Sequence, residues 1–387
     1  MQAETPATVV ATTTPSDVDT LFASLELSKS KWLLTVNSPG GEKFSKHQLE
    51  GGDSGSLLGL LARLRTKAEQ RCGRPVRVMA IQEAGLDGFW LHRLLVDNGV
   101  ESTVVDPASI AVDRRHRRVK TDSVDGETLL RTSMAFARGE RRVCSMVRAP
   151  SPEEEDRRRL TRERGTLLKE RIQHTNRIKG LLNGQGVRDY DPLARDRIAR
   201  LEAVRTGDGR ALPQMLKAEI RRELERIEMA TAQLAIVERA RDAQLRTQAE
   251  GRENPAAMLL EIKGIGAEFA SLLWLEALFR NFANRRQVAA YAGLAPSPWQ
   301  SGAIDRDQGI SKAGDRRLRR TMIELAWFWL RHQPSSALSR WFQERVGAGR
   351  GRIRRIAIVA LARKLLVALW RYVAQGIVPK GAVLKAA

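Results

Sequence analysis

The apolar positions in the first third of the chain alternate between short strand-like runs and longer helical stretches. Four of these runs predict strands over residues 21–27, 31–37, 76–84 and 101–107. The first two runs are separated by a tight connection and predict a hairpin. Helices are predicted over residues 88–99 and from near Thr121 to about Arg138. This alternation is typical of an α/β domain, and the order of a hairpin, strand, helix, strand and helix fits a ribonuclease-H-like one.

From Ser151 the spacing of the apolar positions becomes that of long helices. Residues 151–183 begin with Ser and Pro at the cap, place acids in the first turn and carry Arg and Lys later, which suits the helix dipole. A second long helix follows Pro213. Residues that repeat along it at intervals of three or four are Leu216, Ile220, Leu224, Ile227, Thr231 and Leu234. This spacing predicts an antiparallel coiled coil or a seam for a partner.

A third region, after Asn254 and Pro255, has a helical pattern almost to the end. One insert, residues 295–315, is rich in Gly, Pro, Ser and Asp and is predicted to be a loop. The expected fold is therefore α/β plus all-α. Four parts are predicted: a disordered tail over 1–19, the α/β domain over 20–148, a long-helix coiled-coil region over 149–250, and a helical domain over 251–387.

The chain of 387 residues carries 66 Lys and Arg against 45 Asp and Glu, a net charge of +21. Such an excess favours a polyanionic partner, and nucleic acid is the expected one. The most apolar tract, residues 353–372, is interrupted by five cations, so no membrane span is predicted. The two cysteines, Cys72 and Cys144, have neither disulfide-framework nor zinc-site spacing. With no signal-peptide pattern at its start, the chain is expected in the cytoplasm, at the nucleoid when bound to DNA.

Four acidic residues form a candidate metal site. Asp122 and Asp125 lie three residues apart at a predicted helix start, so both project from one face and can share a cation. Glu26 lies within one predicted strand and Glu83 near the end of another. A carboxylate inside an apolar run is unfavourable unless it is paired or binds metal. Taken singly, the Asp pair also suits a helix cap, and Glu26 also suits the solvent face of a strand.

A basic run directly precedes the Asp pair and could hold a phosphate backbone beside the carboxylates. Its cations are Arg114, Arg115, Arg117, Arg118 and Lys120. A basic run by itself is more often a solvated surface, so both interpretations stay open.

Three segments, SLELSKSKWLL, IQEAGLDGFWLHRLL and RRVKTDSVDGETL, resemble the acidic motifs of the DEDD transposases, the insertion-sequence family one-ten. The amino-terminal domain of that family resembles the Holliday-junction resolvase RuvC. Residues 258–276 and 279–327 are similar to the carboxy-terminal transposase domain of the same family. The resemblance covers nearly everything after the first 20 residues.

The resemblance implies recombination guided by a structured noncoding bridge RNA that pairs with donor and target DNA. It implies that Glu26, Glu83, Asp122 and Asp125 bind Mg²⁺, and that a serine in the carboxy-terminal domain attacks the phosphate to form a phosphoserine link. The first motif of the family usually carries aspartate. Glu26 is longer by one methylene, which moves its carboxylate by over ~1 Å in a site that demands near-octahedral geometry.

Three serines of the insert are candidate nucleophiles: Ser297, Ser301 and Ser311. Ser301, followed by Gly302, matches the Ser-Gly position of the family best, and glycine lets a backbone approach phosphate closely. Serine is a weak nucleophile, and metal activation is the economical way to activate it where no Ser-His-Asp triad is visible. Ser311 is alternatively interpreted as a phosphate contact at a helix amino terminus.

Two further groups are candidate nucleic-acid contacts. The cations predicted to hold the DNA backbone are Lys312, Arg316, Arg317, Arg319 and Arg320. Gly264 and Gly266 suit a helix-hairpin-helix whose amides meet phosphate, and they equally suit a plain turn between helices.

Two alternative functions stay open: a junction-cleaving nuclease that uses water instead of serine, and a basic scaffold that binds RNA or DNA without catalysis. Exchange of two duplexes needs several active sites, so a homodimer assembling to a tetramer is expected. The helix pair over 151–249 is predicted to offer its dimer seam.

Overall fold

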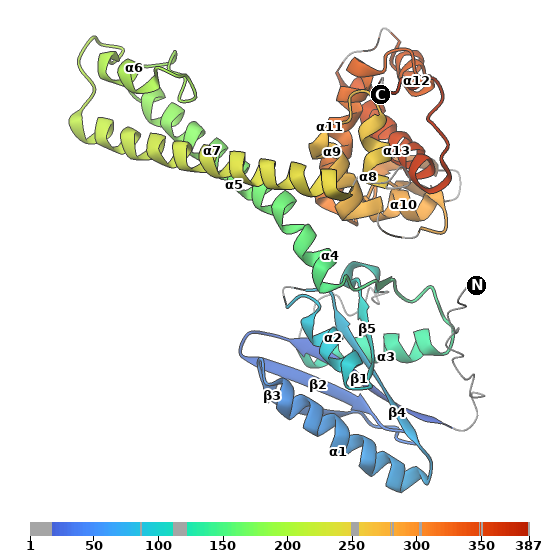
Figure 1. Cartoon of the computed structure of the whole chain (residues 1–387). Helices are drawn as coiled ribbons and strands as arrows, with labels where there is room; N and C mark the ends of the chain where they lie inside the picture. The colour runs from blue at the N-terminus through green and yellow to red at the C-terminus, as the bar shows by residue number, and fades with distance from the viewer. Residues whose placement is uncertain are drawn as a thin grey trace, which may run out of the picture. The chain divides into compact units, whose positions relative to one another are not determined.

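The computed structural model describes residues 18–85, 87–110, 122–248, 255–278, 280, 282–301, 304–347, 349 and 351–385. The tail predicted over 1–19 lies outside these residues up to position 17. The chain divides into two compact units, residues 1–151 and 152–387 (Figure 1). None of the described helices has the length and hydropathy that crossing a membrane requires.

The amino-terminal unit is built on a six-stranded sheet of order β3-β2-β1-β4-β5-β6. The strands are β1 (Asp19–Leu27), β2 (Lys31–Asn37), β3 (Ser45–Glu50), β4 (Val76–Glu83), β5 (Glu101–Val105) and β6 (Met146–Val147). β1 pairs antiparallel with β2 and parallel with β4, and β4 pairs parallel with β5. All four predicted strands are confirmed. The edge strand β3 was not predicted, because its sequence, SKHQLE, lacks an apolar alternation.

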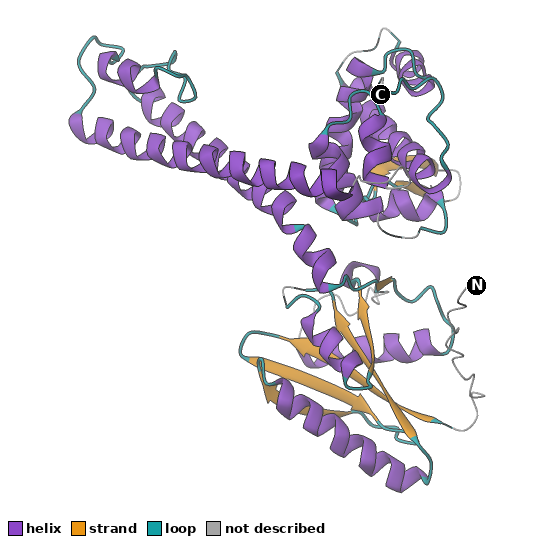
Figure 2. Ribbon diagram, in the orientation of Figure 1, coloured by secondary structure: helices purple, strands orange, loops and turns teal. Residues whose placement is uncertain are grey.

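Helices cover both faces of this sheet (Figure 2). They are α1 (Ser54–Cys72), α2 (Trp90–Asp97) and α3 (Asp122–Ala137), with a short 3₁₀ turn η1 (Pro107–Ser109). Alternate residues of β1, such as Leu21 and Leu25, pack with Leu57 of α1 and Leu91 of α2. On the other face, Ile81 of β4 packs with Leu129 of α3. The period of two along each strand therefore assigns α1 and α2 to one face and α3 to the other.

Two long helices begin the carboxy-terminal unit and run side by side in opposite directions (Figures 1 and 2). The helices of this part are α4 (Pro152–Arg157), α5 (Arg159–Asn183), α6 (Arg197–Ala203) and α7 (Gln214–Gln248). The single helix predicted over 151–183 is thus two helices that meet at Arg158. The side chain of Arg158 is buried within electrostatic range of Glu276, so the break turns this cation toward the carboxy-terminal helices.

The predicted seam of α7 is confirmed at most of its positions. Ile220, Leu224 and Ile227 are buried against Ile178 and Leu182 of α5. Thr231 was predicted in the seam, but it is exposed and Ala230 is buried instead, because the spacing there is three residues and not four. This seam is filled within one chain, so a second copy would have to use another face of the helix pair.

The remaining helices pack around α13. They are α8 (Pro255–Glu261), α9 (Ala267–Leu273), the π-helical turn η3 (Trp274–Leu278), α10 (Arg285–Tyr291), α11 (Arg316–His332), α12 (Ala337–Val346) and α13 (Arg352–Gln375). Leu361 and Leu365 of α13 share a core with Leu325 and Trp329 of α11. The insert predicted to be a loop is in fact a hairpin of β7 (Pro296–Ser301) and β8 (Ile304–Ile310). Its pairing shifts between Pro296 and Pro298, which is where a two-stranded ribbon tolerates proline.

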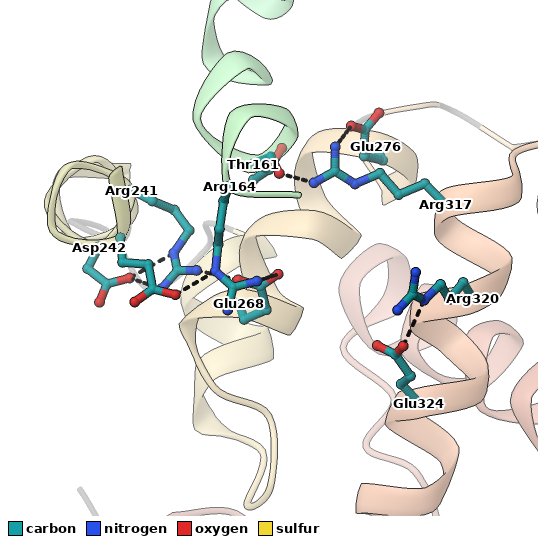
Figure 3. A network of polar contacts seen from close by, with 10 residues as sticks. Thr161, Arg164, Arg241, Asp242, Glu268, Glu276, Arg317, Arg320 and Glu324 are labelled. Carbon is teal, nitrogen blue, oxygen red and sulfur yellow. Dashed lines mark hydrogen bonds and ion pairs between the residues drawn. The ribbon is translucent and has the colours of Figure 1, made fainter. Parts of the chain in front are cut away.

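Arginines fasten the long helices to the carboxy-terminal helices (Figure 3). We call this set the arginine joint; it comprises Arg162, Arg164, Arg241, Arg317, Glu268 and Glu276. Arg162 donates through two nitrogens to the two carboxylate oxygens of Glu276, each at 3.3 Å. Arg317 lies 3.7 Å from the same carboxylate and also donates to the carbonyl oxygen of Thr161.

Glu268 makes the second half of the joint. It accepts from Arg164 at 2.9 Å and from Arg241 (Figure 3). Arg164 also donates to Glu238, and Arg241 to Asp242. The joint therefore connects α5 and α7 to α9, η3 and α11 by charge-assisted hydrogen bonds.

Candidate functional site

Glu26 and Glu83 lie at the carboxyl ends of two neighbouring parallel strands. The register pairs Ser24 with Ile81 and Leu25 with Gln82, so Glu26 and Glu83 are the next positions of β1 and β4. Both are half-buried. By the alternation of each strand, they share the face of Ser24 and Ile81, which is the face that α3 covers.

Helix α3 is held close to the sheet at this point. The hydroxyl of Ser24 donates to the carbonyl oxygen of Gly126 at 2.7 Å. A Cβ atom at Gly126 would lie 2.8 Å from Oγ1 of the buried Thr35 and 3.7 Å from Cγ of Glu26. Because only glycine fits there, the first turns of α3 approach β1 beside Glu26.

The structure thus brings three of the four predicted acids to one side of the sheet. Asp125 directly precedes Gly126 and is half-buried, and Asp122 begins the helix. The side chain of Asp122 lies outside the described residues. Within the described part of the chain, no three side chains of His, Cys, Asp or Glu are grouped closely enough to hold a metal ion. Carboxylates on two strand ends and a helix start nevertheless offer the oxygen donors that Mg²⁺ prefers.

Several other residues lie near the four candidate acids in the sequence or in the fold. Glu127, the acid after Gly126, pairs with Lys46 of β3 at 2.5 Å. The basic run from Arg114 to Lys120 lies outside the described residues. Gly126 and Thr35 were not recognised from the sequence. A glycine in the first turns of a helix is unfavourable without a packing reason, and this signal could have identified Gly126.

Ser301 is the last residue of β7 and pairs with Ile304, so its backbone lies at the tip of the hairpin. Its side chain and Gly302 lie outside the described residues. Ser297 lies in the irregular part of β7 and is half-buried. Ser311 is exposed, and its N–H donates to the carbonyl oxygen of Ala295 at 2.8 Å, closing the base of the hairpin.

The interpretation of Ser311 as a helix amino terminus is wrong. Helix α11 begins at Arg316, and Asp315 is its cap. The carboxylate of Asp315 accepts from the N–H of Leu318 at 2.6 Å, so an acidic side chain already occupies the position where phosphate was predicted.

The five cations predicted to follow Ser311 have different surroundings. Arg317 belongs to the arginine joint, and Arg319 donates to the carbonyl oxygens of Ala292 and Lys312. Arg320 pairs with Glu324 at 3.0 Å on the surface (Figure 3). Lys312 and Arg316 are exposed. Two of the five side chains therefore stabilise the fold of the unit.

The two predicted hairpin glycines lie in the turn between α8 and α9. Gly264 has φ +92°, and a Cβ there would lie 2.6 Å from Cβ of His332. Gly266 caps α9 in an extended conformation with open space around it. The turn requires glycine only at position 264.

Burial shapes the electrostatics of the arginine joint and of the neighbouring Arg158. It lowers the pKa of Arg158 and of Arg317, whereas the hydrogen bond to Glu276 raises the pKa of Arg162. The Glu276 side chain is 3% exposed. The joint therefore gathers more positive than negative charge around one buried carboxylate, and this carboxylate is needed to hold it.

Comparison with known proteins decides the family. The family described as Transposase IS116/IS110/IS902 matches residues 256–341, from α8 into α12, including the β7–β8 hairpin. A protein of Sinorhizobium fredii, "Putative transposase y4rJ", is 59% identical over 378 residues, which cover 95% of this chain and 96% of the relative. The chain belongs to the IS116/IS110/IS902 transposase family. The family predicted from the acidic motifs is confirmed.

More distant members share parts of this transposase. A probable family 20 transposase of Pseudomonas aeruginosa is 30% identical over 227 residues, 58% of this chain and 65% of the relative. The transposase for insertion sequence element IS1328 of Yersinia enterocolitica is 28% identical over 247 residues, 61% of this chain and 70% of the relative. A transposase of an insertion sequence acts on DNA, so the predicted DNA partner is supported.

Proposed function

We propose that this transposase cuts and rejoins DNA strands with an acidic, magnesium-dependent site on its amino-terminal unit and with Ser301 as nucleophile, guided by a structured noncoding RNA. The observation that carries the proposal is the convergence of Glu26, Glu83 and the start of α3 on one side of the sheet. The observed order of β1, β2, β3, α1, β4, α2, β5 and α3 supports a ribonuclease-H-like, RuvC-like domain.

In this proposal Glu26, Glu83, Asp122 and Asp125 hold the ion. When bound, Mg²⁺ would neutralise phosphate charge and favour the attack. Gly126 sets how near α3 comes to Glu26, and the Ser24 hydrogen bond fixes the helix in place. Glu26 reaches further than the usual aspartate, so the position of α3 has to suit the longer side chain.

Ser301 supplies the nucleophilic oxygen. Its place at the end of β7 puts it at a hairpin tip, which a phosphodiester can reach without opening the core. Oγ of the serine bonds to phosphorus while one phosphodiester oxygen leaves, and the Oγ proton goes to solvent or to a base. RNA guidance rests on the family resemblance and on the net charge of +21, which suits a large polyanion.

The test uses the purified full chain with the DNA ends of its element, its flanking RNA and magnesium. We expect a covalent protein–DNA adduct on a denaturing gel, lost in Ser301→Ala and retained in the matched variant Ser297→Ala. Adduct formed by Ser301→Ala would reject this nucleophile, and cleavage without any adduct would favour a nuclease that uses water.

The acidic site and the RNA are tested in the same assay. Glu83→Gln should abolish both cleavage and adduct, whereas Glu127→Gln, on the same face but paired with Lys46, should retain them. Full activity in excess chelator would contradict the requirement for magnesium. Unchanged choice of target DNA in the absence of RNA would contradict guidance by RNA. The proposed assembly of homodimers into a tetramer is checked by light scattering of the loaded complex.

A further inference from the structure

A basic groove of about 1060 Å³ opens on the carboxy-terminal unit between α10, α13, the first residues of β7 and the segment after α13. Six cations line it: Arg285, Arg286, Arg363, Lys364, Arg371 and Lys380. No Asp or Glu is found among the described residues of its lining. We call this the α10–α13 groove.

The cations of the groove differ from those of the arginine joint in their contacts with the rest of the unit. In the part of the chain that the structure describes, none of the six takes part in an ion pair. Arg285, Arg286, Arg371 and Lys380 are exposed. Lys364 lies over the ring of Trp341, 4.7 Å from its centre, which holds one ammonium group at the wall. This concentration of positive charge without carboxylates favours an anionic partner.

The rest of the groove lining is apolar, which narrows the choice of partner. It includes Ala289, Ala290, Pro296, Val367 and Ala368. A DNA duplex presents charged backbones outward and keeps the faces of its bases stacked inside. An unpaired strand presents phosphates along one side and base faces along the other, so it matches both the cations and the apolar residues of the lining.

We propose that the α10–α13 groove binds a short stretch of single-stranded DNA. Pro298 of β7 lines the groove, and Ser301 follows three residues later, about 10 Å along a strand at roughly 3.3 Å per residue. A strand in the groove would therefore run close to the hairpin tip. The inference rests on DNA as the substrate of a transposase and does not depend on the serine mechanism, since its test measures binding alone.

A thiol footprint locates the strand. Ala290→Cys places a thiol at an exposed position of the lining, and Ala232→Cys on the exposed side of α7 is the control, both in full-length Cys72→Ser protein. An oligothymidine of about 12 nucleotides, within the usual range of single-strand sites, should slow maleimide modification at 290 several-fold. Modification at 232 should be unchanged. Equal rates at 290 with and without the oligonucleotide would overturn the proposal, as would stronger protection by duplex DNA or by RNA of the same length.

The salt dependence of oligothymidine binding tests whether the cations of the groove neutralise phosphates. Arg286→Gln with Arg371→Gln should weaken oligothymidine binding and flatten the plot of log affinity against log salt, by about 0.7 for each phosphate that the protein no longer neutralises. The matched pair Arg331→Gln with Arg345→Gln removes the same charge from exposed positions outside the lining. An equal loss of slope in both pairs would mean that only net charge matters, and the groove would be rejected.

Discussion

The arginine joint and the α10–α13 groove are both rich in cations and belong to the same unit, but they differ in their carboxylates. In the joint, Glu268 accepts hydrogen bonds from Arg164 and Arg241. Glu276 is almost completely buried, accepts from Arg162 and lies beside Arg317. In the groove, none of the described lining residues is acidic. The count of 66 Lys and Arg therefore overstates the cations available to nucleic acid, because some of them are paired with carboxylates inside the fold.

The largest effect is expected from removing the buried carboxylate of the joint. Glu276→Gln would remove the negative charge that Arg162 and Arg317 share, at a cost of about 3 kcal/mol in the free energy of unfolding. Urea unfolding followed by tryptophan fluorescence measures this, because six of the eight tryptophans lie in the carboxy-terminal unit. A loss below about 0.5 kcal/mol, the range of an ordinary surface substitution, would show that both guanidinium groups reach water instead.

A second buried carboxylate, Glu223 of α7, extends the comparison to pH. It accepts from His174 at 2.6 Å and from Arg177 at 3.1 Å. Burial acts to raise the pKa of Glu223, but these hydrogen bonds outweigh it and hold the pKa below its usual value. Glu223→Gln should lower stability by about 2 kcal/mol at neutral pH, as expected for hydrogen bonds to a charged group.

The sign of the pH dependence follows from this lowered pKa. As the pH falls, the unfolded chain binds the proton first, near its usual pKa of about 4.3, so the contribution is complete above that pH. It is lost as the pH falls through the lower folded-state value. The difference in unfolding free energy between the native chain and Glu223→Gln should therefore shrink under acid conditions. A constant difference down to acid pH would contradict the assignment.

A smaller effect is expected at Glu268. Arg164 retains Glu238 and Arg241 retains Asp242 when Glu268 becomes glutamine. The cost should be about 1 kcal/mol, near that of one ordinary hydrogen bond. The same unfolding measurement distinguishes Glu268 from Glu276, and equal losses at the two positions would mean that burial of the carboxylate does not decide the cost.

The smallest change is expected in the groove. Arg286→Gln with Arg371→Gln should alter the free energy of unfolding by no more than about 0.5 kcal/mol, because neither side chain is paired or buried. A clear loss of stability would mean that these cations support the fold, and a clear gain would mean that they repel one another. Either result would be seen in the same urea titration.

Local patterns were sufficient to predict β1, β2, β4, β5 and α7, because their apolar residues face a core at a regular period. They were insufficient for the β7–β8 hairpin, whose prolines and Asp residues have the composition of a loop. Helix α1 was overlooked although its signals are present: Asp53 caps it through the N–H of Ser56, and Gly73 ends it with φ +67°.

The candidate sites show the same limit. The acids could be selected from the sequence, but the register that puts Glu26 beside Glu83 depends on pairing between strands far apart in the chain. The α10–α13 groove could not be predicted, since Arg286 and Arg371 are brought together only by the packing of α10 on α13. The arginine joint could not be predicted for a related reason: nothing in the sequence distinguishes Arg317 from cations that face solvent.

The close packing at Gly126 offers one way in which a copy of such an element can lose activity. The gap between α3 and the sheet is too narrow for a methyl group, since a Cβ at position 126 would lie 2.8 Å from Oγ1 of Thr35, which is completely buried. An alanine codon at this position would leave every core residue intact and still push the helix away from the strand that bears Glu26. If the acidic site acts as we propose, such a gene would keep an unbroken reading frame and encode a folded product without activity.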